Sequence, residues 1–221
     1  MTGIKGKNSM YLYRTGTMMG RMDQTDIYKL IYGQMKQLTN GWRGLKTMIV
    51  LVIDIQKGIT DDRLYNYETF LESTKRVIDT ARKNNVEVIY VQHDDGPGTG
   101  FSVGDVDFEI ADQVAPKEGE KIYTKEINSC FGNKELAGYL DEQADKTLMI
   151  VGLQTNFCID ASVKSAFERG YKVIIPEGTN STFDNDYMDG ETTYKYYNEM
   201  IWPKRFADCV SLDEALGMME I

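Results

Sequence analysis

From residue 48 onward, short apolar runs alternate with longer stretches in which apolar residues recur every three or four positions. The short runs are rich in Val, Ile and Tyr and predict strands, whereas the longer stretches predict amphipathic helices. The predicted strands cover 48–54, 86–92, 121–125, 147–152, 172–176 and 205–211. The predicted helices cover 67–84, 133–144, 157–170, 190–200 and 212–220.

This alternation points to one fold class. Near-continuous apolar strands separated by helices are typical of a parallel sheet with helices on both faces. We therefore predict that residues 48–221 form a three-layer, doubly wound α/β domain with a mostly parallel six-stranded sheet, in the order 3-2-1-4-5-6. In that order the first and fourth strands are neighbours where the winding reverses, and ligands bind beyond their carboxyl ends.

Residues 1–47 have a different pattern. The first 21 residues are rich in Gly, Thr and Lys and lack a hydrophobic period, so we expect them to be disordered. Apolar residues at helical spacing then predict one amphipathic helix over 23–39, which can pack on the body or on a second subunit. We treat 1–47 as a partly disordered N-terminal extension.

Charge and composition narrow the choice of partners. Residues 1–47 carry a net charge of +6 and the remainder −15, for a total of −9, and an acidic body argues against nucleic acid. The longest apolar run, 48–53, is too short to span a bilayer, so we expect no membrane partner. Three cysteines in 221 residues do not make a disulfide framework, which predicts a cytoplasmic protein.

Three reactive side chains stand at predicted strand ends. Asp54 ends the first strand, Lys125 ends the third, and Cys158 follows the fourth, in the stretch "GLQTNFCID". The carboxyl ends of parallel strands lie on one edge of the sheet, so we expect the three to meet at the crevice where the winding reverses.

The residues around these positions resemble a known family. "VLVIDIQKG", "VIYVQHDDG", the lysine of "YTKEINSCF" and "IVGLQTNFCIDASVKSAFERGY" are similar to the isochorismatase-like cysteine hydrolases, which include nicotinamidase and N-carbamoylsarcosine amidohydrolase. The likeness covers about residues 48–211. It implies a catalytic triad of Asp54, Lys125 and Cys158, and a cis peptide bond between Leu153 and Gln154.

The resemblance also implies a mechanism. A thiol with a pKa of about 8.5 needs help to ionise at neutral pH. The start of a helix and the Lys125 ammonium would favour the thiolate, and Asp54 would accept the proton and later give it to the leaving amine. Backbone N–H groups of Gln154 and Cys158 would form the oxyanion hole. The substrate would then be a small-molecule amide, cleaved through a thioester.

No metal or organic cofactor is expected. Nicotinamidases hold a divalent metal with an Asp and two His, whereas this chain has one histidine, His93. A site made of His93, Asp94 and Asp95 would be crowded, because the three are consecutive.

The remaining candidates concern the pocket. His93, Phe101, Phe131 and Phe157 are candidate walls of a substrate pocket, although each can equally be a strand-end or core residue. Cys130 and Cys209 are expected to be packing residues. Two other functions stay open, an isochorismatase-type ether hydrolase in which the thiol is idle, and a non-catalytic small-molecule binding module. We expect a homo-oligomer, a dimer or a tetramer.

Overall fold

The computed structural model describes residues 13–14, 17–18 and 48–220. The chain divides near residue 45 into two units. In the first unit, β1 (Tyr13–Arg14) pairs antiparallel with β2 (Thr17–Met18), where the sequence predicted no element. The helix predicted over 23–39 and the rest of the extension lie outside the described residues.

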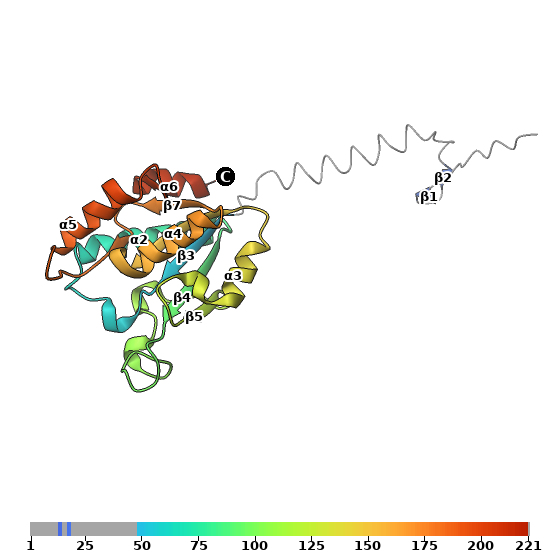
Figure 1. The fold of residues 1–221 in the computed structure, drawn as a ribbon. Coiled ribbons are helices and arrows are strands. Elements are labelled where there is room, and N and C mark those ends of the chain that lie inside the picture. The colour runs from blue at the N-terminus through green and yellow to red at the C-terminus, as the bar shows by residue number, and fades with distance from the viewer. Residues whose placement is uncertain (1–12, 15–16, 19–47, 221) are drawn as a thin grey trace, which may run out of the picture. The chain divides into compact units, whose positions relative to one another are not determined.

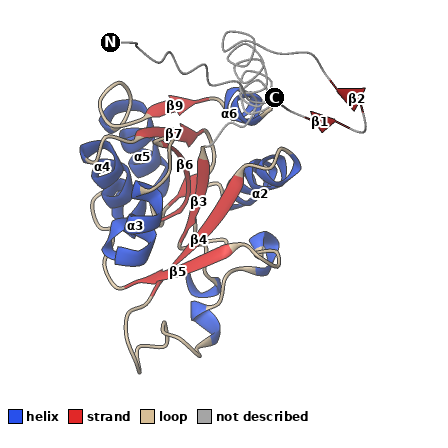
Figure 2. Ribbon diagram, turned by 90° about the vertical axis from the view of Figure 1, so that its right-hand side faces the viewer, coloured by secondary structure: helices blue, strands red, loops and turns tan. Residues whose placement is uncertain are grey.

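The second unit is built on a parallel sheet (Figure 2). Its strands lie in the order β5-β4-β3-β6-β7-β9, which confirms the predicted order 3-2-1-4-5-6, and a short strand, β8, pairs with β6 beyond the end of β7. The strands are β3 (Ile49–Ile53), β4 (Glu87–His93), β5 (Lys121–Lys125), β6 (Thr147–Leu153), β7 (Lys172–Pro176), β8 (Asn180–Ser181) and β9 (Asp208–Val210).

Alternation along β3 explains the two hydrophobic cores. All five residues of β3 are buried, and successive side chains point to opposite faces of the sheet. Ile49, Leu51 and Ile53 belong to one core, whereas Val50 and Val52 belong to the other. A strand buried on both faces needs helices on both faces, which is the three-layer arrangement predicted from the apolar runs.

Helices cover both faces of the sheet (Figures 1 and 2). One face carries α2 (Tyr67–Lys83) and α6 (Leu212–Met219), and the other carries α3 (Lys134–Asp141), α4 (Asp160–Glu168) and α5 (Gly190–Lys195). Short 3₁₀ segments lie in the loops at Lys57–Ile59, Val106–Phe108, Asp112–Val114 and Cys130–Gly132. No helix in the described part of the chain is long and apolar enough to cross a membrane.

Two predicted helices contain a wider turn. The helix predicted over 157–170 begins with a π-helical turn at Thr155–Ile159 before α4, and the one predicted over 190–200 ends in a π-helical segment, Tyr196–Ile201. The last strand is shorter than predicted, because the N–H groups of Phe206 and Ala207 bond to the Trp202 carbonyl in a turn. Hydrophobic spacing does not distinguish an α-helical turn from a π-helical one.

Candidate active site

Strand ends bring the three predicted catalytic side chains together. Asp54 follows β3 with a φ of 53°, Lys125 is the last residue of β5, and Cys158 lies in the turn after β6. The Lys125 ammonium lies 2.8 Å from Asp54 Oδ2 and 3.3 Å from Cys158 Sγ. The three are thus in direct contact, although they are more than thirty positions apart along the chain.

His93 completes the set of groups around the lysine. An ammonium has three N–H donors, and that of Lys125 contacts three acceptors, the third being His93 Nδ1 at 2.9 Å. Because an ammonium donates and cannot accept, His93 Nδ1 is the acceptor in this hydrogen bond, which leaves Nε2 as the N–H of the ring. That N–H faces Asp95 Oδ1 at 3.0 Å.

Burial sets the charge properties of Asp54. The side chain is 2% exposed, and burial raises the pKa of its carboxyl above the usual range, against the opposing effects of the Lys125 ammonium and the Cys158 thiol. Oδ2 accepts the lysine hydrogen bond, whereas Oδ1 is buried without a partner of good geometry in the described part of the chain. A carboxylate oxygen in this state is suited to accept a proton.

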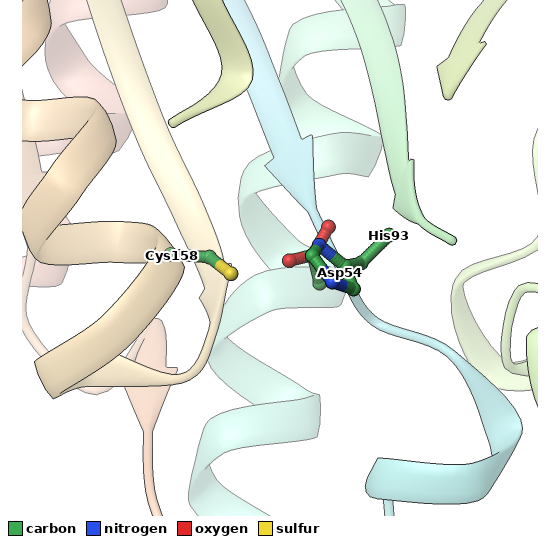
Figure 3. Close-up of side chains that lie close together, drawn as sticks. All are labelled: Asp54, His93 and Cys158. Atoms are coloured by element: carbon green, nitrogen blue, oxygen red, sulfur yellow. The ribbon is translucent and has the colours of Figure 1, made fainter. Parts of the chain in front are cut away.

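The expected shift of Cys158 toward thiolate is wrong. Burial raises the pKa of the Cys158 thiol to about 12; the Asp54 carboxylate adds to this shift and the Lys125 ammonium opposes it. At neutral pH the resting side chain is therefore a thiol. Figure 3 shows its sulfur facing the Asp54 carboxylate, and ligand atoms of Asp54, His93 and Cys158 lie within 4.8 Å of one another. Ionisation of this thiol therefore requires transfer of its proton to a nearby group.

A close approach of two strands positions the loop that carries the cysteine. Gly152 has a φ of +133°, and a Cβ there would lie 1.9 Å from the Ile53 carbonyl oxygen. Only glycine fits this position, so β6 runs tightly beside β3 just before the loop. The bond between Leu153 and Gln154 is cis.

Side chains behind the loop hold it in place. Thr155 Oγ1 donates to Asn180 Oδ1 at 2.7 Å, and Asn180 and Asn198 exchange two amide hydrogen bonds of 2.9 and 3.0 Å. All three residues are buried, so these bonds satisfy polar groups that water cannot reach.

A cavity of about 250 Å³ opens onto Asp54 and Cys158. It is lined by Asp54, Ile59, His93, Asp95, Phe101, Gln154, Phe157 and Cys158. Three of the four candidate pocket residues, His93, Phe101 and Phe157, line this cavity. Phe131 instead lies in a hydrophobic core, with its ring 5.6 Å from that of Tyr171 and the Arg169 guanidinium over its face.

Residues 48–211 match the sequence profile of the isochorismatase domain. The chain belongs to the isochorismatase family. This confirms the resemblance found in the sequence and makes the protein an isochorismatase-family hydrolase. It is 31% identical over 141 residues to the isochorismatase family protein YddQ of Bacillus subtilis, which covers 62% of this chain and 78% of YddQ.

Two further family members extend the comparison. The ureidoacrylate amidohydrolase RutB of Rhizobium rhizogenes is 22% identical over 205 residues, covering 75% of this chain and 83% of RutB. A crystal structure of an isochorismatase family protein superposes with a TM-score of 0.69 at 29% identity, covering 75% of this chain and 99% of that one. The likeness thus extends over most of the described domain.

The side chains that could bind a metal ion at this site are already in contact with a lysine. Asp54, His93 and Cys158 offer donor atoms close enough together to bind a metal ion. However, the Lys125 ammonium already contacts all three, at 2.8, 2.9 and 3.3 Å. A metal ion among them would lie against this fixed positive charge, so these residues do not fit a metal in this arrangement.

The other two cysteines lie away from this arrangement. Cys130 is fully buried, and burial raises the pKa of its thiol to about 11. Cys209 lies in β9, and burial raises the pKa of its thiol to about 12. Neither lines the cavity, in keeping with the packing roles expected for them.

Several residues near the triad had no signal in the sequence. The buried amide of Gln56 accepts from the His93 N–H at 2.7 Å and donates to the His93 carbonyl at 3.0 Å, which fixes the end of β4. Asn128 Oδ1 lies 3.8 Å from Cys158 Sγ. Ile59 lines the cavity, and so does Asp95, which the sequence had offered only as part of a crowded metal site with His93 and Asp94. Their positions depend on the paths of loops, which hydrophobic spacing does not reveal.

Proposed function

We propose that this protein is a cysteine hydrolase that cleaves the C–N bond of a small-molecule amide through a thioester intermediate. The observation that carries the proposal is the Lys125 ammonium in contact with both Asp54 and Cys158 at the base of a cavity. The name of the relative RutB, an amidohydrolase, supports C–N cleavage as the type of reaction.

The first half-reaction forms the thioester. Cys158 Sγ attacks the amide carbonyl carbon while its proton moves to Asp54, whose Oδ1 has no other partner of good geometry. The negative charge that develops on the carbonyl oxygen is bound by the backbone N–H groups of Gln154 and Cys158. When the C–N bond breaks, Asp54 gives the proton to the departing nitrogen, and the acyl group remains on sulfur.

The second half-reaction releases the acid. Water attacks the thioester carbon and gives a proton to Asp54, and the sulfur leaves and takes that proton back. Asp54 acts first as a base and then as an acid in both halves, and its raised pKa suits both roles. Lys125 remains positively charged and stabilises the thiolate that exists transiently.

A second candidate is the hydrolysis of an enol ether with an idle thiol. One observation favours it. Burial raises the pKa of Asp54, so this side chain is more easily protonated and can serve as the acid that such a reaction needs. The two candidates differ in their dependence on sulfur, because the ether reaction forms no bond to Cys158.

Replacement of the cysteine tests the proposal. We expect Cys158→Ala to fold and to lose ammonia release from small amides and ureido acids by several orders of magnitude, while the control Cys209→Ala keeps its rate. Amide hydrolysis that persists in Cys158→Ala would overturn the nucleophile assignment. Hydrolysis of isochorismate that is unaffected by the same change would favour the ether reaction.

A further inference from the structure

The cavity over Cys158 presents negative charge and aromatic rings. Two of the residues that line it are carboxylates, Asp54 and Asp95, and two are the aromatic residues Phe101 and Phe157. Within the described part of the chain, its lining includes no lysine or arginine. Lys125, which contacts Asp54 and Cys158, has a fully buried side chain and is not among the lining residues.

The lysines near the cavity are already paired with carboxylates. Lys125 directs its three N–H groups at Asp54, His93 and Cys158, and its charge is balanced by Asp54 at 2.8 Å. On the loop that leads to Ile59, the Lys57 ammonium pairs with Glu109 at 2.7 Å and with Asp112 at 3.2 Å. A substrate carboxylate would therefore meet no uncompensated cation among these groups.

Asp95 supplies the uncompensated charge. Its side chain is 54% exposed, and its Oδ1 lies 3.0 Å from His93 Nε2, on the same ring whose Nδ1 faces the Lys125 ammonium. The Asp95 N–H donates to the Phe101 carbonyl at 3.0 Å, which keeps the carboxylate beside the segment that carries an aromatic wall. A carboxylate next to aromatic faces is an arrangement that attracts cations.

From this arrangement we infer that the enzyme selects amides that carry a positively charged group, such as a quaternary ammonium, and that Asp95 binds this group. The inference rests on the proposed function and names the substrate class of the same site. It sets the protein apart from its relative RutB, whose named substrate, ureidoacrylate, carries a carboxylate. The net charge of −15 on residues 48–221 would further attract a cation.

Charged thiol reagents measure this selectivity without any need for turnover. Methanethiosulfonates carrying a trimethylammonioethyl or a sulfonatoethyl group react with a thiolate to form a mixed disulfide and release methanesulfinate. We would follow the modification of Cys158 by intact mass, with Cys158→Ala giving the background from the other cysteines. Each rate is divided by the rate of the same reagent with the uncharged thiol 2-mercaptoethanol, which removes the intrinsic difference between the reagents.

At low ionic strength we expect the corrected rate of the cationic reagent to exceed that of the anionic one by about tenfold. Added salt should reduce this preference. Asp95→Asn should remove most of this preference, because the amide oxygen can still accept from His93 while the charge is gone. Asp208→Asn, at the amino end of β9, removes one charge far from the cavity and should leave the ratio unchanged.

A wild-type ratio near one, or one that favours the anion, would overturn the inference, even if Asp95→Asn does not fold. A cation preference that persists unchanged in a folded Asp95→Asn would show that Asp95 is not the binding group. Failure of the proposed amide hydrolysis would be seen separately, as absent turnover, and would not alter the reagent ratio.

Discussion

Replacing Lys125 by methionine removes the ammonium that contacts Asp54, His93 and Cys158 and keeps an unbranched side chain of similar length. In the folded protein the side chains of Lys125 and Asp54 are 0% and 2% exposed, and their polar atoms are 2.8 Å apart. The variant therefore leaves a carboxylate buried without its partner. Breaking a buried ion pair in this way costs about 3–5 kcal/mol of folding free energy.

The cost should depend on pH in a defined direction. Burial raises the pKa of Asp54 in the folded state, and Lys125 opposes that shift, so the folded-state pKa of Asp54 rises further in Lys125→Met. A folded-state pKa above the unfolded one means that stability falls as pH rises from the unfolded pKa to the folded pKa. The variant should thus lose more stability relative to wild type at pH 8 than at pH 5.

The assay is urea unfolding at pH 5 and at pH 8. It compares wild type, the single variants Asp54→Asn and Lys125→Met, and the double variant Asp54→Asn/Lys125→Met. The double variant removes both charges and should recover most of the loss, which gives a large coupling between the two sites. A loss below about 1 kcal/mol at pH 8, or additive single and double variants, would refute the reasoning from the buried ion pair.

Two further predictions concern the thiol and the metal. The pKa of the Cys158 thiol is raised to about 12, so the rate of its labelling by iodoacetamide should rise about tenfold per pH unit between pH 7 and 9 without a plateau. Labelling should be slower still in Lys125→Met, because the ammonium that favours the thiolate is gone. A plateau near pH 8.5 would mean that Cys158 is an ordinary thiol. Because the Lys125 ammonium contacts the three groups that could hold a metal, activity should be unchanged after exhaustive EDTA treatment; activity lost to chelator and restored by one equivalent of metal would contradict this.

The parts of the fold that follow from local chemistry could be predicted from the sequence. The apolar runs at 48–54 and 147–152 correspond to β3 and β6, because strands buried on both faces need continuous apolar residues. The meeting of Asp54, Lys125 and Cys158 follows from the parallel sheet, since all three stand at carboxyl ends of strands.

Features that depend on the paths of loops or on depth of burial could not be predicted. The direction of the Cys158 pKa shift was missed, because a helix start and a nearby lysine are visible in the sequence but the desolvation that outweighs them is not. Phe131 and Phe157 are equally apolar, yet one lies in a core and the other is 52% exposed at the cavity. The contact between His93 and Lys125 required the pairing of β4 with β5 at their last residues.

The central claim is that the substrate's acyl group is carried on Cys158. It is tested most directly by mass spectrometry of acid-quenched protein during turnover of an amide substrate found by ammonia release. The account predicts that Cys158, and neither Cys130 nor Cys209, gains the mass of the acyl group, and that hydroxylamine removes it. Turnover at full rate with no acyl mass on Cys158, in an experiment fast enough to capture the first cycle, would contradict the account.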